Sequence, residues 1–143
     1  WGANSYGNLG DNSMSPRTVP VMVSGAGGIG QLSGVKSVAA GELTSMALKW
    51  DGTVWSWGGN ARGELGDNSD PGVKMLSQVP IQVVAADPVA ALTGVKGIAT
   101  GFHGLAVKTD GTIWSWGQNI YGELGLGTAD GISHPLATDI ALP

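Results

Sequence analysis

Hydrophobic and polar side chains alternate over short stretches of the chain, which is the pattern of half-buried β-strands. Met46 and Leu48, for example, alternate with Ala47 and Lys49. An Asp-Gly pair at 51–52 then separates this run from a second β-rich run, and such a pair is a strong hairpin signal. We therefore predict four antiparallel strands in this part of the chain, at 35–40, 44–49, 53–58 and 80–84.

The same pattern returns further along the chain. The stretch GVKSVAAGELTSMALKWDGTVWSWG at 34–58 matches GVKGIATGFHGLAVKTDGTIWSWG at 94–117, with a second Asp-Gly pair at 110–111. The match predicts a second set of strands at 95–100, 103–108, 112–117 and 137–142. Capped apolar runs with a helical period are absent from the sequence, so the predicted fold class is all-β.

A tryptophan-glycine motif occurs three times, and its copies start 56 and 59 residues apart. The copies read WGANSYGNLGDNS at 1–13, WGGNARGELGDNS at 57–69 and WGQNIYGELGLGT at 116–128. Four short antiparallel strands per repeat are typical of a β-propeller blade. We predict a partial β-propeller of four-stranded antiparallel blades with about two and a half repeats. Its parts are the outer portion of an incomplete blade at 1–33 and two blades at 34–93 and 94–143.

The repeat inventory does not make a closed ring, because propellers typically have four to eight blades. The first unit has the tryptophan-glycine segment but no strand pair before it, and the chain begins with Trp1 instead of methionine. We expect either a section of a longer chain or several copies that associate through their open faces, and we favour the first. Head-to-tail joining does not supply the two strands that the first unit lacks.

Composition narrows the class of function. With 25 glycines, 42% hydrophobic residues and six tryptophans, the chain has many turns and enough apolar surface for a core. Its net charge is −4 with only seven lysines and arginines, which disfavours nucleic acid and anionic membranes as partners. Hydrophobic runs long enough for a transmembrane helix are absent from the sequence. The absence of cysteine excludes disulfides and thiolate chemistry.

The repeated motifs resemble the regulator-of-chromosome-condensation repeat family. They are V-A-A-G, then A-L-K-x-D-G-T-V-W-S-W-G, then N-x-x-G-x-L-G, and they recur over essentially the whole chain. The family usually has His before Ser in the second strand. His103 matches that position, but Thr44 takes the place of the histidine in the other copy, and Gly104 stands where the other copy has Ser45.

This resemblance implies a propeller that usually has seven blades, but it does not imply one function. The founding member of the family is a nucleotide-exchange factor for a Ran-type GTPase and binds chromatin, and bacterial relatives inhibit β-lactamases. Exchange activity depends on an inserted hairpin, and neither repeat interval contains one. The acidic balance of the chain disfavours chromatin. Guanine-nucleotide exchange is therefore not the predicted function.

Residues that could carry catalysis have structural explanations in the sequence. His103 has no second histidine, cysteine or acid pair near it to complete a site. Asp51 and Asp110 each lie in an Asp-Gly turn, which explains them without acid–base chemistry. Oxygen-bearing side chains suggest calcium, but their spacing fits Asx-type turns better; they are Asp11, Asn12, Asp67, Asn68, Ser69 and Asp70. We predict no catalytic residue, no metal site and no cofactor.

The repeated tryptophans and asparagines also have structural interpretations. A row of tryptophans could stack on sugars, but their place in the repeat predicts packing between blades instead; they are Trp55, Trp57, Trp114 and Trp116. A carbohydrate-active enzyme would also need a convergent acid pair. Asn60 and Asn119 are expected to hold their loops by bonding to nearby backbone groups.

Topology predicts where a binding surface lies. In an antiparallel meander, the turn between the first two strands and the loop between the last two lie at the same end of the blade. This places six residues on one face: Tyr6, Glu42, Leu43, Arg62, Phe102 and Tyr121. Tyr and Arg are enriched at protein–protein hot spots. We predict a non-enzymatic protein-interaction module; the alternative is a structural unit that assembles with further blades or into homo-oligomers.

Overall fold

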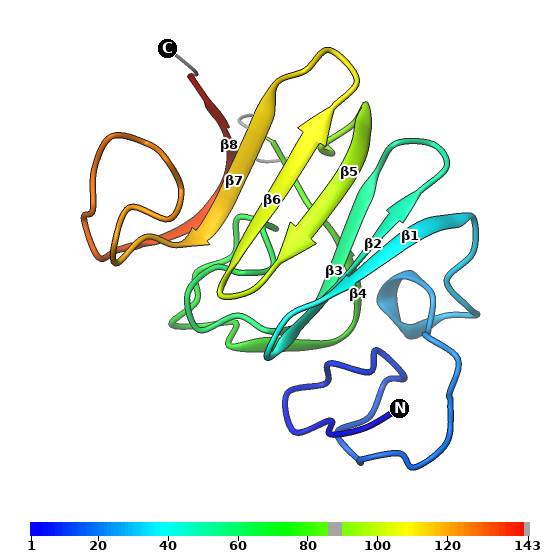
Figure 1. The fold of residues 1–143 in the computed structure, drawn as a ribbon. Coiled ribbons are helices and arrows are strands. Elements are labelled where there is room, and N and C mark those ends of the chain that lie inside the picture. Colours follow the sequence, from blue (N-terminus) through cyan, green and yellow to red (C-terminus); the bar gives the residue numbers. More distant parts are fainter. Residues whose placement is uncertain (86–89, 142–143) are drawn as a thin grey trace.

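The computed structural model describes residues 1–85 and 90–141, and it contains two four-stranded antiparallel sheets (Figure 1). The first sheet consists of β1 (Val35–Ala40), β2 (Thr44–Lys49), β3 (Val54–Gly59) and β4 (Leu76–Gln82). The second consists of β5 (Val95–Thr100), β6 (His103–Lys108), β7 (Ile113–Gln118) and β8 (Ser133–Ile140). Neighbouring strands follow chain order in both sheets, so each sheet is a four-stranded meander. The predicted all-β blade architecture is confirmed.

The inner strands have the predicted bounds, and the outer strands do not. β1, β2, β5 and β6 begin and end where the alternation predicts, and β3 and β7 are shifted by one residue. The fourth strand, predicted at 80–84, runs from Leu76 to Gln82 instead. The ladder between β3 and β4 shifts register there, since Ser56 pairs with Ile81 but Gly58 pairs with Ser77. Pro80, which has no N–H to donate, lies in this irregularity, so the proline does not start the strand.

The last strand departs from its prediction for the same reason. It was expected at 137–142 but begins at Ser133, and Pro135 lies in an equivalent register shift opposite β7. The predicted end at Leu142 lies outside the described residues.

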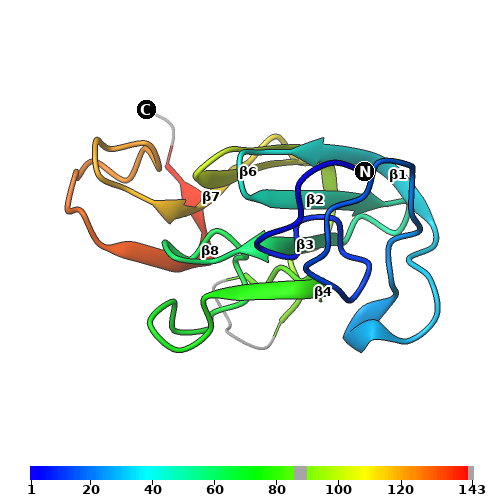
Figure 2. The same ribbon diagram turned by 90° about the horizontal axis from the view of Figure 1, so that it is seen from below.

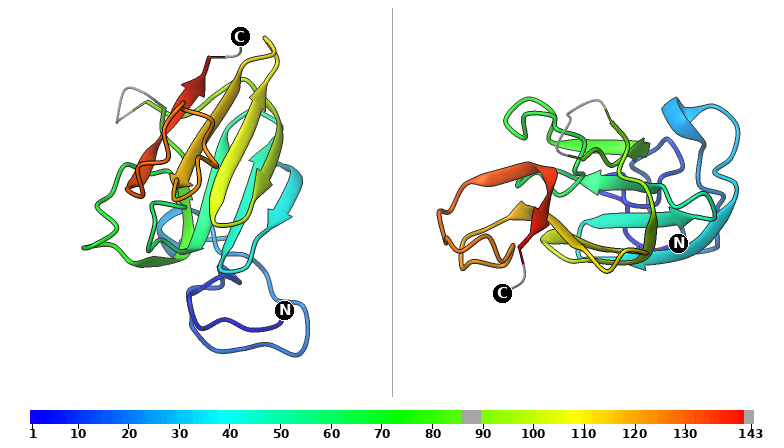
Figure 3. Two further views of the ribbon diagram at one scale, coloured as in Figure 1. Left: turned by 60° about the vertical axis from the view of Figure 1, so that its left-hand side comes forward. Right: turned by 90° about the horizontal axis from the view of Figure 1, so that it is seen from above.

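Residues 1–33 fold without any strand as long as those of the sheets. Isolated bridges join Gly2 to Arg17 and Ser24 to Gln31, and a single 3₁₀ turn, η1 (Ala26–Gly28), lies within the second of these. The segment lies alongside the first sheet, at the opposite end of the molecule from β8 (Figures 2 and 3).

The two sheets pack face to face through one apolar core. Met46, Leu48 and Val54 of the first sheet are fully buried in a cluster that also contains Val95 and Trp116 of the second. β2 and β5 are the principal strands in contact across this interface. Because side chains alternate along each strand, each sheet has two apolar faces. One face can pack against the unit before it and the other against the unit after it.

One tryptophan in each sheet binds it to the loop of the unit before it. Trp57 is 4% exposed and its Nε1–H donates to the Asn8 carbonyl at 3.0 Å. Trp116 is fully buried and donates to the Glu64 carbonyl at 2.9 Å. The predicted burial of both side chains between repeats is confirmed. The indole of Trp116 also explains Gly104, because a Cβ at that position would overlap the Trp116 ring.

The other two repeated tryptophans are only half-buried. A lysine ammonium lies 5.8 Å from the Trp55 ring centroid and another lies 5.2 Å from that of Trp114, a cation–π arrangement in each repeat. Trp114 also packs against the core cluster. The predicted packing between blades is therefore confirmed for Trp57 and Trp116, and in part for Trp114.

The far face of the second sheet is open. Leu105, Val107 and Ile113 stand at the repeat positions of Met46, Leu48 and Val54, but they are half-buried and line a cavity of about 340 Å³. In the described part of the chain, no further sheet covers them.

Candidate functional site

Four connections gather at one end of the two sheets, and we call this surface the loop face. It comprises residues 41–43, 60–75, 101–102 and 119–132, at the lower ends of the strands in Figure 1. Tyr6 of the N-terminal segment belongs to it as well, because this side chain lines a cavity together with Leu43. The β2–β3 and β6–β7 hairpins lie at the opposite end. Backbone bonds hold the face together: Gly59 N–H donates to the Leu43 carbonyl at 2.8 Å, and Gln118 N–H donates to the Phe102 carbonyl at 3.1 Å.

The predicted binding residues fall into two groups on this face. Tyr6 and Leu43 line one cavity together with Ala61, the neighbour of Arg62. Phe102 and Tyr121 belong to the second sheet and its loops. Tyr6 is 43% exposed, Phe102 44% and Tyr121 85%, whereas Leu43 is half-buried.

Three apolar side chains on the long loops were not predicted from the sequence. Met75 is 62% exposed, Val73 84% and Ile132 60%. A signal for them exists, since each is an apolar residue in a loop, outside any strand pattern. Because the repeats differ most in these loops, comparison between the copies did not single them out.

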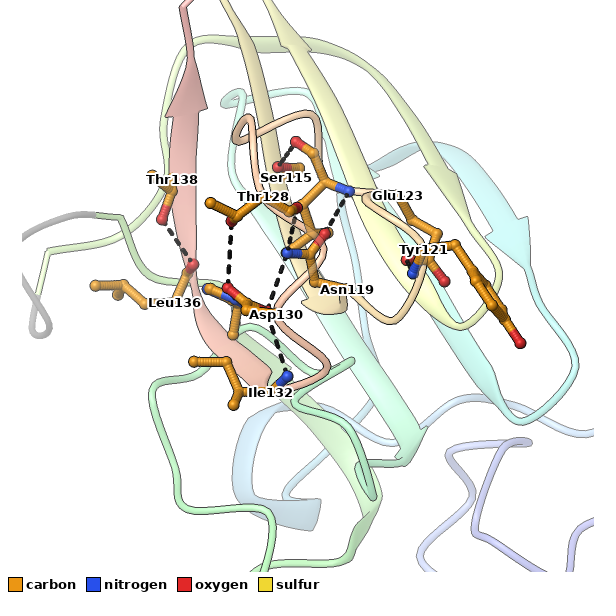
Figure 4. Close-up of polar contacts among 11 residues, drawn as sticks. Ser115, Asn119, Tyr121, Glu123, Thr128, Asp130, Ile132, Leu136 and Thr138 are labelled. Carbon is orange, nitrogen blue, oxygen red and sulfur yellow. Dashed lines mark hydrogen bonds and ion pairs between the residues drawn. The ribbon is translucent and has the colours of Figure 1, made fainter.

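A buried asparagine organises each loop of the tryptophan-glycine motif. Asn60 is fully buried; its Oδ1 accepts the Leu65 N–H at 3.0 Å, and its Nδ2 donates to the Lys74 carbonyl at 2.8 Å. Asn119 makes the equivalent bonds to Leu124 and Thr128 (Figure 4). The predicted loop-holding role of both asparagines is confirmed. Hydrogen bonds to a buried asparagine therefore tie each loop together, although the loop contains no regular structure.

An aspartate and a basic side chain close each of these loops. Arg17 pairs with Asp11 at 2.9 Å, and Lys74 pairs with Asp67 at 2.7 Å. Burial raises the pKa of Asp67, but hydrogen bonds from Lys74 and Ser69 outweigh it, and the net pKa lies below the usual value. In the third loop the basic partner is His134, 3.1 Å from Asp130.

Turn hydrogen bonds account for the oxygen-rich sequence pattern that could suggest calcium. Ser69 N–H donates to the Asp67 carboxylate at 3.2 Å, and Gly72 N–H donates to Asp70 at 2.8 Å. Asn12 and Asn68 both have φ of 59°, the left-handed conformation that asparagine tolerates in turns. Within residues 1–85 and 90–141, no cluster of three metal-ligating side chains occurs.

The carboxylates of the two hairpin aspartates accept hydrogen bonds from residues of their own turns. Thr53 N–H donates to Asp51 at 3.0 Å, and Thr112 N–H donates to Asp110 at 3.0 Å. The Thr53 hydroxyl lowers the pKa of Asp51, and the backbone N–H of Thr112 does the same for Asp110. Both carboxylates lie at the end of the sheets opposite the loop face.

Glu64 and Glu123 occupy equivalent positions in the second and third loops, but they accept different hydrogen bonds. Glu64 is 4% exposed, and its Oε2 accepts the Arg62 N–H at 2.7 Å. Glu123 accepts the Tyr121 N–H on Oε2 and the Gln118 side chain on Oε1, at 2.7 and 2.9 Å. The bond from Gln118 lowers the pKa of Glu123.

Comparison with known proteins gives consistent matches along the chain. The regulator of chromosome condensation (RCC1) repeat matches at residues 1–48, 51–101 and 110–141, and a second profile of this repeat matches at 35–64. The ultraviolet-B receptor UVR8 of Arabidopsis thaliana is 34% identical over 130 residues, which are 89% of this chain and 26% of UVR8. The E3 ubiquitin-protein ligase HERC2 of Homo sapiens is 33% identical over 142 residues, 94% of this chain and 3% of HERC2.

Solved structures match the fold over nearly the whole chain. Prp20p of Saccharomyces cerevisiae has a TM-score of 0.70 at 25% identity, covering 99% of this chain and 33% of its own. Human WBSCR16 has a TM-score of 0.74 at 23% identity, covering 99% of this chain and 32% of its own. The chain thus spans about a third of the length of these two proteins. Among the described residues, no helix is long and apolar enough to cross a membrane.

Proposed function

The chain belongs to the regulator of chromosome condensation (RCC1) repeat family, and from that premise we propose that its loop face binds a protein partner without catalysing a reaction. The observation that carries the proposal is the exposure of Tyr6, Phe102 and Tyr121 on one end of the sheets. Turn tips have no need of large aromatic side chains for folding. Tyrosine concentrates binding energy at protein interfaces, and the exposed Arg62 belongs to the same class of residue.

The hydrogen bonds of the buried asparagines support this proposal. Such bonds favour one loop conformation, and a surface that is ordered before binding loses less conformational entropy when a partner docks. The exposed apolar side chains Val73 and Met75 extend the surface on the same loop.

Relatives with described protein partners also favour a protein-binding role. Prp20p has binding properties to Gsp1p and histones, and Kap60 has been crystallised bound to yeast RCC1 (Prp20). Other relatives are a photoreceptor and a ubiquitin ligase, so family membership does not identify the partner. The net charge of −4 favours a protein over nucleic acid or an anionic membrane.

The non-enzymatic part of the proposal is supported by how the candidate carboxylates are used. Asp51 and Asp110 accept hydrogen bonds within their own turns and stand in separate blades. An acid–base pair would require two carboxylates converging on one cleft.

Affinity capture with a paired variant tests the proposal. The chain carrying Tyr6→Ala and Tyr121→Ala should keep its circular dichroism spectrum but lose at least about tenfold in affinity for a partner that the parent captures. Trp50→Ala is the matched control, because Trp50 is an aromatic side chain with 73% exposure in the hairpin at the opposite end. Equal affinity of the parent and the double variant would remove the loop face from the interaction.

We propose as a second candidate that the chain is a structural unit of a larger propeller. The open face formed by Leu105, Val107 and Ile113 favours it, because the equivalent face of the first sheet is fully buried by the second. The two candidates are compatible, since one uses the lateral face of the blade and the other uses its end.

A further inference from the structure

A small cavity on the loop face has a composition that the repeat does not require. It measures about 160 Å³ and lies where the N-terminal segment meets the first sheet. Its walls are largely apolar, but one charged side chain enters them; the lining includes Tyr6, Leu43, Gly59, Glu64, Met75 and Leu76.

The second repeat shows why this cavity exists. Position 59 is glycine, whereas the equivalent position in β7 is Gln118, whose side-chain amide donates to Glu123 Oε1 at 2.9 Å. Without that amide the first repeat has an empty space in front of Glu64. Figure 4 shows the second repeat, with Glu123 beside Tyr121.

Glu64 consequently has one oxygen without a donor. Its Oε2 accepts the Arg62 N–H at 2.7 Å, but within the described residues no donor reaches Oε1. Only 4% of the residue is exposed. Among the described residues, the fully buried side-chain atom without a hydrogen-bond partner is Thr100 Oγ1, so Glu64 Oε1 keeps some accessible surface. A cation that enters the cavity can therefore reach this oxygen.

We propose that this cavity receives a lysine side chain from the protein partner of the loop face. Apolar walls suit the four methylene groups of the lysine stem, and Glu64 Oε1 accepts a hydrogen bond from the ammonium. Arginine fits less well, because a guanidinium pairs best with both oxygens of a carboxylate and Oε2 is already bonded. The proposal rests on the proposed function, and it gives the chemistry of one contact.

Peptide titration isolates this contact from the rest of the interface. The ¹⁵N-labelled chain is titrated with acetyl-Gly-Lys-Gly-amide and with the same peptide containing norleucine, which has the same stem without the charge. The lysine peptide should give saturable shifts of the Gly59 and Ala61 amides, and the norleucine peptide should bind at least about tenfold more weakly. An arginine peptide should fall between them. Equal binding of the lysine and norleucine peptides, or no saturable shift with lysine, would overturn the proposal.

Variants distinguish the contribution of the Glu64 carboxylate to peptide binding from that of the cavity in front of it. Glu64→Gln should lower the affinity for the lysine peptide by about tenfold or more. Gly59→Gln should do the same by supplying the amide that Gln118 supplies in the second repeat. Gly59→Ala places a Cβ at the same point, 3.2 Å from the Leu43 Cβ, but leaves Oε1 free, and it should retain binding. Glu123→Gln is the control in the other repeat and should have no effect.

The captured partner distinguishes failure of this proposal from failure of the proposed function. If the double tyrosine variant loses the partner but Glu64→Gln binds as the parent does, the lysine contact is wrong and the loop face stands. If neither variant loses the partner, both are wrong. If both weaken binding and Glu123→Gln does not, both are supported.

Discussion

Trp116→Ala is the substitution that perturbs the packing between blades most directly. The side chain has no exposed surface, lies against Gly104 and Gly66, and donates its N–H to the Glu64 carbonyl at 2.9 Å. Truncation leaves a cavity at the centre of the interface and an acceptor without its donor.

The structure sets the expected magnitude. Replacing a fully buried tryptophan by alanine costs about 3–5 kcal/mol when the surroundings do not collapse. Collapse is limited here because two sheets, both held by their own ladders, face the cavity. Since whole domains are stable by only about 5–15 kcal/mol, the variant should lose a large part of its free energy of unfolding.

Urea unfolding followed by far-UV circular dichroism measures this loss without relying on tryptophan fluorescence. Trp50→Ala is the control, because Trp50 is 73% exposed and the Lys36 ammonium lies 5.7 Å from its ring centroid. The control should change the unfolding free energy by less than about 1 kcal/mol. If the two variants unfold at the same urea concentration, Trp116 does not hold the blades together and the packing argument is wrong.

Three further predictions concern stability. Gly104→Ala should destabilise the fold by about 1–3 kcal/mol in the same assay, because its Cβ would meet the Trp116 ring, whereas Gly101→Ala, with no atom within 4 Å of the added Cβ, should not. Asn60→Ala should cost about 2–3 kcal/mol by leaving the Leu65 N–H and the Lys74 carbonyl unpaired, and a parent-like urea midpoint would contradict it. The lowered pKa of Asp67 stabilises the fold above about pH 3.9, and this contribution is lost as the pH falls through the folded-state value. The free energy of unfolding of Lys74→Met should therefore fall less steeply than that of the parent as the pH is lowered. If the two proteins show the same dependence on pH, the Asp67–Lys74 pair contributes nothing to stability.

The repeat made most of the fold predictable. Alternation and the two Asp-Gly turns gave the bounds of four inner strands because both signals depend on the local sequence alone. The outer strands were placed wrongly: the first was expected to start at Pro80 and the second at Ala137, after Pro135, but they start at Leu76 and Ser133. Each proline lies within a register irregularity instead, and a register shift depends on the partner strand as well as on the local sequence.

The candidate site was predictable in part. Meander topology placed Tyr6, Leu43 and Phe102 at the correct end of the sheets. The cavity in front of Glu64 was not predicted. Its signal is present in the sequence, because Gly59 aligns with Gln118 of the other repeat. Interpreting it requires knowing that the glutamine amide reaches the glutamate, which is a three-dimensional fact.

Blades that are built to be covered on both lateral faces are the central feature of this fold. Sedimentation velocity of the chain over a range of concentrations tests this feature most directly. The half-buried Leu105, Val107 and Ile113 should drive concentration-dependent association, and Leu105→Glu should reduce it. A stable, compact and soluble monomer of 14.4 kDa at all concentrations would contradict the need for a covering blade.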